Sequence, residues 1–450
     1  MSYARDLIDR AVTMNPGEVE FHQAVEEVML SLQSLFEREP KYQKFRIGER
    51  VIEPERQIIF AVPWVDDKGN MRINRGFRIQ FNSALGPYKG GFRFHPSVTL
   101  GTLKFLGFEQ IFKNSLTGLS LGGAKGGSNF DPKGKSEVEI MRFCQSFMTE
   151  LFRHLGPTRD VPAGDIGVGG REIGYMFGQY KRLTAHFEGV LTGKNVKWGG
   201  SLARTEATGY GAVYMAENML KVRKKQLAGM VCTVSGSGNV AIYTVEKLYQ
   251  CGAKPVTVSD SQGMIHHPGG INLEVLKQVK EVERARLTRY AELCKDAVYT
   301  PVTSYPKGRN AVWSVPCQAA FPCATQNELH EEDAKQLLAN GCTLVSEGAN
   351  MPATAKAVDL FLAAGIAYAP GKAANAAGVA TSQLEMAQNA SMQQWSFETV
   401  DQKIREIVAH IFTAMHTTAE EFGQPGNYVL GANIAGFRKV ADAMLEQGCV

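Results

Sequence analysis

The stretch "MVCTVSGSGNVAIYTVEKLYQCGAKPVTVSDSQG", residues 230–263, decides the fold class of this chain. It contains an apolar run, a glycine turn, a helical pattern and a second apolar run that ends at Asp260. A βαβ unit needs about 30 residues, which is the length of this stretch. Apolar runs of strand type follow within 311–322, 342–350 and 365–378, and helical patterns separate them. This alternation predicts an α/β fold with a parallel, doubly wound sheet.

The glycine turn, "GSGNVA" at residues 236–241, fits the G-x-G-x-x-A pattern of dinucleotide-binding units. Gly236 would allow a tight turn, Gly238 would let a pyrophosphate approach the backbone, and Ala241 would let the helix pack closely on the strand. The helix N-terminus would offer unpaired N–H groups to the phosphates. Because a strand precedes the turn and an acidic residue ends the next strand, we expect a nicotinamide or flavin nucleotide here.

The residues that would select the nicotinamide cofactor point in two directions. Asp260 stands where a carboxylate usually binds the ribose 2′-hydroxyl, which favours NAD. Ser261 follows it directly, and several basic residues occupy the next helical stretch, where they form either a solvated face or a 2′-phosphate site. These basic residues are Lys277, Lys280, Arg284, Arg286 and Arg289.

Composition excludes several classes of partner. The formal charge of +4 over 450 residues gives no reason to expect nucleic acid. Residues 1–10 carry charges throughout, unlike a signal peptide, and no run of about 18 apolar residues predicts a membrane span. The eight cysteines are scattered without zinc spacing, so we expect no metal and reduced thiols in a cytoplasmic protein.

The chain is long enough for two or three domains. Its N-terminal part predicts a helix that is capped by Asn15 and buries Phe21, strands over 56–65 and 71–82, and a helix over 98–116. Composition changes near residue 200. We therefore expect a first domain over 1–200, a dinucleotide-binding domain over 201–425, and a C-terminal helix within 426–450 that returns to the first domain.

Three lysines and one carboxylate stand out ahead of the dinucleotide unit. Lys125 lies among four glycines in "LGGAKGGSN", and no Ser or Thr follows it as a phosphate-binding P-loop requires. Lys89 lies beside two glycines in "GPYKGGFRFHP". Lys113 and Gln110 form the polar end of one helix face. Asp165 lies in a second glycine-rich segment, "VPAGDIGVGG".

In these segments the chain resembles the hexameric glutamate dehydrogenases of the short, microbial type. The resemblance extends over essentially the whole chain through further segments in the family's order: "KNSLTGLSLGGAKGGSNFDPKGKS", "RTEATGYG", "EGANMP", "KAANAAGVATSQLEMAQN" and "NYVLGANIAGF". It implies an N-terminal α/β domain for substrate binding and oligomerisation, and a Rossmann-like dinucleotide domain. It also implies a homohexamer that deaminates L-glutamate oxidatively and reversibly to 2-oxoglutarate and ammonium with NAD or NADP.

The resemblance assigns the catalytic chemistry to two residues. Lys125 would polarise the carbonyl and activate water, a role that needs a neutral amine for part of the cycle. Burial and neighbouring cations lower the pKa of a lysine and so favour that state. The flanking glycines are expected to let the substrate reach the Lys125 nitrogen. Asp165 would carry protons to and from the substrate nitrogen.

By the same resemblance, Lys113 and Gln110 would hold the α-carboxylate, and Lys89 and Ser382 the γ-carboxylate. Gly164 also belongs to the predicted substrate site. The predicted cofactor residues are Thr208, Gly236, Ser237, Gly238, Asn239, Val240, Asp260, Ser261, Lys280, Arg286, Asn350 and Asn375.

Two residues decide between substrates within the class. Without a carboxylate partner, Lys89 and Ser382 would be left unpaired, which disfavours leucine or phenylalanine. The alternatives are an amino-acid dehydrogenase for another side chain and a catalytically silent NAD(P)-binding regulatory protein. Lys280 and Arg286 fall where NADP-using members of the family place basic residues, so NADP is predicted ahead of NAD.

Overall fold

The computed structural model describes residues 2–449, which form two compact units. The residues up to Arg204, Val379–Val400 and the residues from Asn433 onward form the first unit. Thr205–Gly378 and Asp401–Ala432 form the second unit. These limits differ from the sequence-based ones because 379–400 belongs to the first unit and 426–432 belongs to the second. There the Asn389 amide donates to the carbonyl of Gly199, at 2.7 Å.

Short helices open the first unit, and they correct one prediction. Asn15 ends the first helix, with its side chain donating to the Ala11 carbonyl at 2.8 Å, and does not cap the second helix. The predicted apolar face is buried, with Phe21 and Val25 fully inaccessible. The helices are α1 (Tyr3–Met14), α2 (Val19–Ser31), α3 (Gln33–Arg38), α4 (Pro40–Lys44) and α5 (Ile47–Val51).

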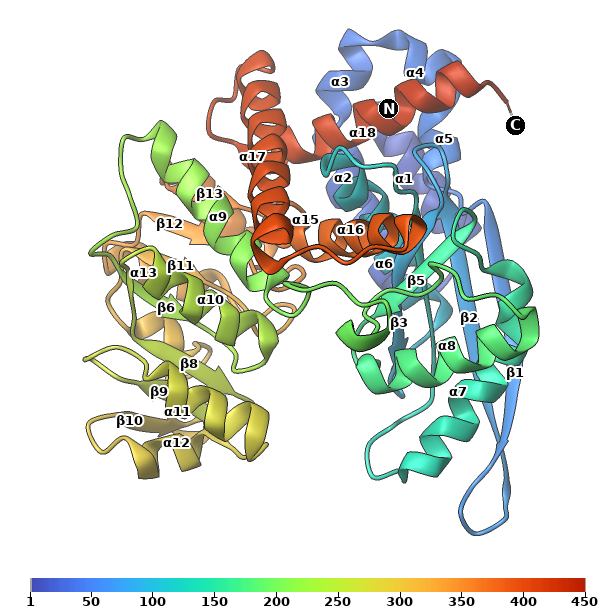
Figure 1. The fold of residues 1–450 in the computed structure, drawn as a ribbon. Helices are drawn as coiled ribbons and strands as arrows, with labels where there is room; N and C mark the ends of the chain where they lie inside the picture. The colour runs from blue at the N-terminus through green and yellow to red at the C-terminus, as the bar shows by residue number, and fades with distance from the viewer. Residues whose placement is uncertain (1, 450) are drawn as a thin grey trace. The chain divides into compact units, whose positions relative to one another are not determined.

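A five-stranded mixed sheet carries the first unit, in the order β1-β2-β4-β3-β5 (Figure 1). The strands β1, β2 and β4 pair antiparallel, whereas β3 pairs parallel with both β4 and β5. The two predicted strands are observed over the predicted residues. The strands are β1 (Arg56–Val65), β2 (Met71–Asn82), β3 (Tyr88–Phe94), β4 (Gly123–Ser128) and β5 (Asp160–Gly164).

The glycines around Lys125 have a structural explanation that differs from the predicted one. Gly123, Gly126 and Gly127 belong to β4, a central strand, and Gly122 directly precedes it. A Cβ on Gly126 would lie 2.8 Å from the Phe77 carbonyl oxygen of β2, and one on Gly123 would lie 2.7 Å from Ile111. The close approach of neighbouring backbone therefore requires these glycines. That they also let a substrate reach Lys125 stays a prediction.

Three longer helices complete this part of the unit. The helix predicted over 98–116 begins at Leu100, and the Thr99 hydroxyl caps it by accepting from the Thr102 N–H at 3.2 Å. An aromatic cluster that includes Phe92, Phe143 and Phe147 forms a core between sheet and helices. The helices are α6 (Leu100–Leu116), α7 (Glu137–Leu151) and α8 (Gly170–Thr184).

The second unit contains the predicted parallel sheet, in the order β13-β12-β11-β6-β7 (Figure 1). All four neighbouring pairs are parallel, which confirms the predicted doubly wound fold class. The strands are β6 (Val231–Val234), β7 (Lys254–Pro255), β11 (Ala319–Phe321), β12 (Leu344–Ser346) and β13 (Ala367–Ala369). The helices with them are α9 (Ala207–Val222), α10 (Asn239–Gln250), α13 (Glu331–Ala339), α14 (Ala355–Ala363) and α15 (Gly371–Ala374).

The second strand of the predicted βαβ unit is divided. Only Lys254–Pro255 pairs with β6, and the next segment pairs antiparallel with a different strand. This forms a three-stranded sheet of β8 (Thr257–Asp260), β9 (Gly263–His266) and β10 (Val298–Pro301). Two short helices, α11 (Leu273–Lys277) and α12 (Leu287–Leu293), accompany it.

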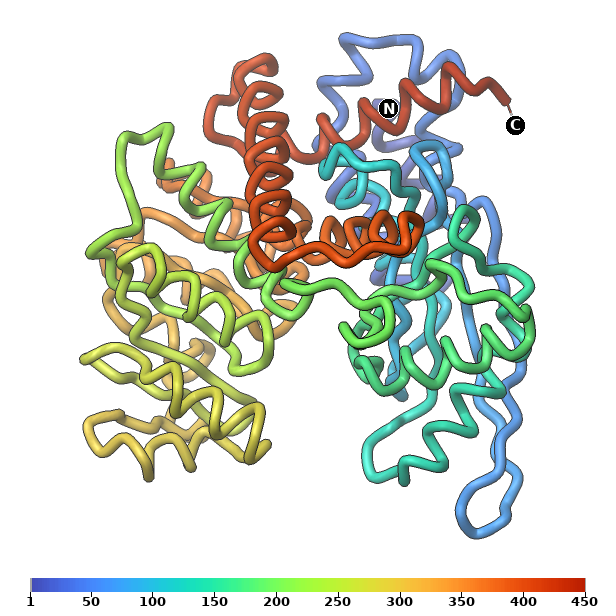
Figure 2. The backbone as a smooth tube through the Cα atoms, viewed as in Figure 1, coloured from blue at the N-terminus to red at the C-terminus, as the bar shows by residue number. Residues whose placement is uncertain are grey.

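Three helices end the chain: α16 (Ala377–Ser391), α17 (Phe397–Glu421) and α18 (Tyr428–Gln447). The backbone trace in Figure 2 shows α18 beside the N-terminal helices. There Phe437 meets the ring of Phe36 edge-on at 5.4 Å, and Tyr42 donates to Asp442 at 2.9 Å. Within residues 2–449, no helix combines the length and the apolar character needed to cross a membrane.

Candidate active site

Lys125 and Asp165 form an ion pair in the first unit. Their Nζ and Oδ2 atoms are 3.1 Å apart, and the two side chains are 6% and 17% exposed. Arg93 of β3 donates through Nε to the same carboxylate oxygen at 2.8 Å. The parallel pairing of β3 with β4 and with β5 brings the three residues together, because Phe92 is opposite both Gly126 and Gly164.

The environment shifts both pKa values in useful directions. Burial lowers the pKa of Lys125, and the charges of Arg93 and Arg78 lower it further, although Asp165 opposes them. Burial alone would raise the pKa of Asp165, but the charges of Lys125 and Arg93 outweigh burial and lower it to about 2. The site therefore contains an ionised carboxylate within direct proton-transfer distance of an amine that loses its proton more easily than an ordinary lysine.

Arg93 is a site residue that the sequence reasoning missed. It lies four residues after Lys89 in one strand, and positions separated by an even number share a face of a strand. The two-residue alternation of side chains along this strand could therefore have identified Arg93 from the sequence.

Lys89 lies in the same sheet but has a different partner. Its side chain is fully buried, and Nζ donates to the hydroxyl of Thr192 at 2.8 Å. Burial holds its pKa well below the ordinary value, and the negative charge of Glu385 opposes this shift. Neither Thr192 nor Glu385 was predicted from the sequence.

The end of α6 lies beside Lys89. The Gln110 amide donates to Asn114 at 2.7 Å, and the Asn114 amide donates to the carbonyl of Lys89 at 3.1 Å. A Cβ on Gly90 would lie 3.4 Å from Gln110. Lys113 follows Gln110 by three residues, so the two occupy neighbouring positions on the helix surface.

Gly164 lies in a crowded, partly buried position, and Ser382 is buried. Gly164 ends β5, where a Cβ would lie 2.5 Å from the carbonyl oxygen of Val168. Ser382 of α16 is 1% exposed and lies three residues before Glu385, on the same side of the helix. The first unit thus contains every predicted catalytic and substrate residue.

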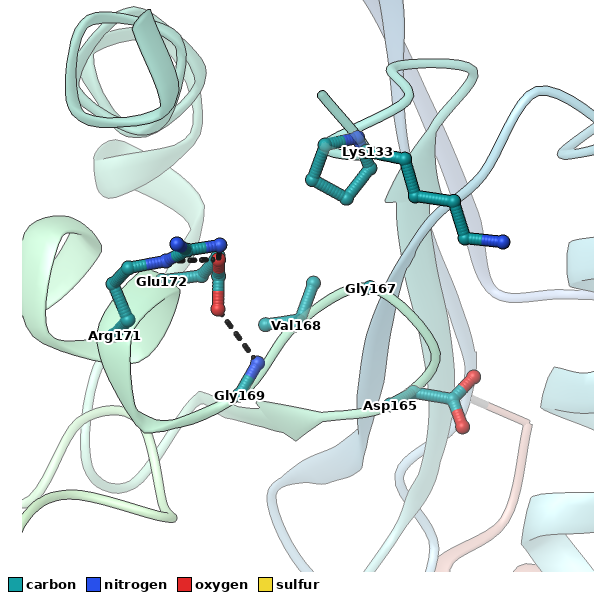
Figure 3. A pocket seen from close by; sticks show the side chains of 8 residues that line it. Lys133, Asp165, Gly167, Val168, Gly169, Arg171 and Glu172 are labelled. Carbon is teal, nitrogen blue, oxygen red and sulfur yellow. Dashed lines mark hydrogen bonds and ion pairs between the residues drawn. The ribbon is translucent and has the colours of Figure 1, made fainter. Parts of the chain in front are cut away.

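A pocket of about 480 Å³ opens beside Asp165 (Figure 3). On one side Glu172 accepts the Gly169 N–H at 2.8 Å and pairs with Arg171 at 2.6 Å. Asp165 lies on the other side of the glycine-containing loop, away from that pair, and Lys133 also lines the pocket. Asp165 therefore borders a cavity through which protons or a small ligand can reach it.

The glycine turn of the second unit has the features expected of a phosphate site. Gly236 has a left-handed φ of 84°, and a Cβ there would lie 2.8 Å from the Cys323 carbonyl oxygen. The Gly236 N–H donates to Ser259 at 2.8 Å, which fixes the turn. No side chain caps α10, which begins at Asn239 directly after Gly238. Its first N–H groups are therefore suited to an anionic ligand.

Asn375 carries an unpaired buried acceptor. Its amide nitrogen donates to the carbonyl of Ala349 at 3.0 Å and to Asn350 at 2.9 Å, but no donor in the described part of the chain reaches its buried Oδ1. A buried polar atom needs a partner, and a nucleotide hydroxyl or amide donor would supply one. Thr208 lies beside Gly378, which follows Asn375 by three residues. A Cβ added to Gly378 would lie 2.5 Å from the Thr208 hydroxyl oxygen. These residues fit a nicotinamide nucleotide.

The predicted 2′-phosphate residues lie together after β8. Arg286 donates to the Ser261 hydroxyl at 3.0 Å, and Lys280 donates to the carbonyl of Ala285 at 2.9 Å. Burial lowers the pKa of Lys280, and Arg286 adds to that effect while Asp260 opposes it.

Asp260 itself accepts backbone N–H groups. Its two oxygens accept from Gln262 at 2.9 Å and from Leu287 at 3.1 Å. Two other basic residues of this stretch are engaged elsewhere, because Lys277 pairs with Glu246 and Arg289 pairs with Glu283. The structure thus separates Lys280 and Arg286 from Lys277 and Arg289, which have carboxylate partners. Within the described residues, no group of His, Cys, Asp and Glu is arranged to hold a metal ion.

Comparison with known proteins places this site in a family. Residues 199–448 match the model of Glutamate/Leucine/Phenylalanine/Valine dehydrogenase, and residues 54–182 match that of the Glu/Leu/Phe/Val dehydrogenase dimerisation domain. The chain belongs to the Glu/Leu/Phe/Val dehydrogenase family, as the sequence resemblance predicted.

Full-length relatives are similar to the chain. It is 63% identical to the NADP-specific glutamate dehydrogenase of Helicobacter pylori over 446 aligned residues. The alignment covers 99% of this chain and 100% of that relative. Glutamate dehydrogenase of Plasmodium falciparum superposes with a TM-score of 0.96 at 54% identity, over 99% of this chain and 95% of that one. The hetero-hexameric glutamate dehydrogenase of Thermus thermophilus gives a TM-score of 0.80 at 26% identity, over 93% and 97% of the two chains.

Proposed function

We propose that this protein is an NADP-dependent glutamate dehydrogenase, which interconverts L-glutamate with 2-oxoglutarate and ammonium. One observation carries the choice of substrate. Lys89 is fully buried, and a hydroxyl is its hydrogen-bond partner in a family whose members differ in the substrate side chain they accept. A buried cation without an anionic ligand is unfavourable, so the site selects a side chain that ends in a carboxylate. The 63% identity to an NADP-specific relative supports the cofactor.

The catalytic roles fall to Lys125 and Asp165. Lys125 polarises the substrate carbonyl and, when neutral, activates the water that adds to the imine. Asp165 passes a proton to or from the substrate nitrogen, and its contact with Lys125 at 3.1 Å allows direct exchange between the two groups. Arg93 keeps Asp165 ionised and oriented through its 2.8 Å hydrogen bond.

The substrate carboxylates bind at two places. Lys113 and Gln110 hold the α-carboxylate at the end of α6, while Lys89 and Ser382 hold the γ-carboxylate. Gly164 lines the site at the end of β5. Charge-assisted hydrogen bonds of this kind fix both ends of the substrate, and so set the Cα–H bond in one orientation.

NADP, when bound, supplies the hydride acceptor for the substrate Cα. Backbone N–H groups of the turn and the start of α10 would hold its pyrophosphate, with Asn375 and Thr208 near the nicotinamide half. The residues for the pyrophosphate are Gly236, Ser237, Gly238, Asn239 and Val240, and Asn350 supports Asn375. Ser261, Lys280 and Arg286 would hold the 2′-phosphate. Asp260 is held by two backbone N–H groups beside them.

The two units are assigned separate tasks. The first, with the returning C-terminal helix, binds substrate and makes the subunit contacts, and the second binds the dinucleotide. The dimerisation-domain match over 54–182 and the hetero-hexameric relative support a hexamer, and a homohexamer is the form proposed for this chain. Sedimentation equilibrium tests the hexamer, and a monomer or dimer as the active species would contradict it. We also propose that the enzyme is located in the cytoplasm.

A turnover assay tests the function. NADPH oxidation with ammonium and 2-oxoglutarate should greatly exceed oxidation with ammonium and 4-methyl-2-oxopentanoate, whose side chain is apolar. A preference for the apolar oxoacid would establish the alternative of an amino-acid dehydrogenase for another side chain. No turnover with any oxoacid, together with NADP binding, would establish a silent regulatory protein.

A further inference from the structure

Lys89 lies within a group of buried charges in which cations outnumber carboxylates. The charged groups that act on it include Arg78 of β2, Lys194 and Arg204 of the segment between α8 and α9, and Glu385 of α16. Arg78 is compensated by Asp160, whose Oδ2 accepts from its Nε at 2.9 Å, with both side chains inaccessible. The Nε of Arg204 is buried and finds no acceptor in the described part of the chain. Glu385 is therefore the carboxylate that faces Lys89 without being committed to Arg78.

Glu385 joins α16 to the segment that contains the hydrogen-bond partner of Lys89. Its Oε1 lies 2.8 Å from Nζ of Lys194, and these side chains are 0% and 1% exposed. Its two oxygens also accept the backbone N–H of Gly193 at 2.9 Å and that of Lys194 at 3.3 Å. Thr192, which accepts from Lys89, directly precedes these residues. Ser382 lies one helical turn before Glu385, so this carboxylate joins the helix of Ser382 to the segment of Thr192.

We propose that Glu385 is a positioning residue for substrate selection, which holds the Thr192 segment against Lys89 and supplies a negative charge to its surroundings. This inference rests on the proposed function, since the ammonium form is the one that recognises a γ-carboxylate. Lys194 pairs with Glu385 at 2.8 Å, so the carboxylate is not committed to an ion pair with Lys89. Lys89 therefore stays available to a ligand.

The electrostatic part of this role predicts a direction for the change in the pKa of Lys89, which a purely structural role does not. Burial, Arg204, Arg78 and Lys194 all lower the pKa of Lys89, and Glu385 raises it. Removing the charge of Glu385 must therefore lower the pKa of Lys89, so that the ammonium form is lost at a lower pH. Removing the charge of Lys194 must shift the same transition to a higher pH. A residue that only maintains the local fold would not move the transition in opposite directions in the two variants.

The test uses Glu385→Gln, Lys194→Met and the double variant in the full-length enzyme. Two profiles against pH are measured: KM for 2-oxoglutarate, and the affinity for glutarate, a dicarboxylate without the reacting group, by calorimetry. Glu385→Gln should raise KM for 2-oxoglutarate about tenfold, with a smaller change in kcat, and move the alkaline loss of affinity to lower pH. Lys194→Met should move it to higher pH, and the double variant should return toward the wild type.

Shifts of the same sign in both single variants, or an alkaline limb that does not move, would overturn the inference. The KM for NADPH and the thermal unfolding midpoint report local unfolding in each variant. If Glu385→Gln does not fold, the upward shift expected for Lys194→Met still decides the matter. Glutarate binding requires no turnover. A wild-type enzyme that binds glutarate but does not reduce 2-oxoglutarate would therefore contradict the proposed function, while the pH shifts would still test Glu385.

Discussion

Two buried lysines of one sheet, Lys125 in β4 and Lys89 in β3, differ in what holds them. Lys125 lies 3.1 Å from the carboxylate of Asp165, whereas Lys89 donates to the hydroxyl of Thr192. Burial lowers the pKa of both lysines. The carboxylate that opposes this shift for Lys125 is its direct partner Asp165. For Lys89 it is Glu385, which pairs with Lys194 instead. The first arrangement suits proton exchange within the site, and the second leaves a cation that a ligand must satisfy.

The largest effect is expected from removing the proton-exchanging lysine. Lys125→Ala should lower kcat by about a hundred- to a thousandfold, because a charge-assisted contact in the transition state contributes about 3–4 kcal/mol. NADPH binding, measured by fluorescence titration, should not change, since Lys125 acts on the substrate. Near-normal turnover would show that the catalytic assignment is wrong.

The second lysine should affect the choice of substrate and not the chemistry. Lys89→Leu with Ser382→Val should lower kcat/KM for glutamate about tenfold or more, since each lost charge-assisted hydrogen bond costs about 1.5–3 kcal/mol. Activity toward norleucine should fall less, or rise. Steady-state kinetics with both amino acids give the ratio. An unchanged ratio would remove the basis for assigning glutamate.

The cofactor site offers a comparison between cations that differ only in their partners. Lys280→Ala with Arg286→Ala should raise KM for NADP about tenfold, or about 1.4 kcal/mol, and leave KM for NAD almost unchanged. The matched control is Lys277→Ala with Arg289→Ala, because these side chains pair with Glu246 and Glu283. Equal effects on the two cofactors, or the same effect in the control, would contradict the 2′-phosphate assignment.

The smallest effect concerns the neighbour of the first lysine. Arg93 lowers the pKa of both Lys125 and Asp165, so Arg93→Met should raise both. Since oxidative deamination needs neutral Lys125, the acid limb of kcat/KM for glutamate should move to higher pH. Arg72→Met is a suitable control, because Arg72 is 56% exposed and pairs with Asp66. A shift to lower pH in Arg93→Met would reverse the assigned sign.

The two lysines also show what the sequence could predict. The segments around Lys125 and Asp165 were identified from glycine content and order along the chain, and the dinucleotide turn from a local pattern. Their exact setting was not predicted, because the glycines of β4 are required by backbone that packs on both sides of the strand, and those neighbours are distant in the sequence.

The partners of Lys89 were beyond local reasoning. Thr192 lies 103 residues from Lys89 along the chain, and Glu385 lies a further 192 residues from Gly193, whose N–H it accepts. Neither residue has a local pattern that distinguishes it from an ordinary polar residue. Arg93 is the exception, since the alternation of β3 places it on the face of Lys89. Local periodicity predicts helices and strands. Hydrogen bonds to a buried charge from residues far away in the sequence form only when the unit folds, so local patterns do not predict them.

A structure of the enzyme with NADP and 2-oxoglutarate tests the central claim most directly. The account predicts that a γ-carboxylate oxygen lies about 2.7–2.9 Å from Nζ of Lys89, as in other charge-assisted hydrogen bonds, with the substrate carbonyl beside Lys125. A substrate whose γ-carboxylate binds elsewhere, while Lys89 still donates only to Thr192, would contradict it.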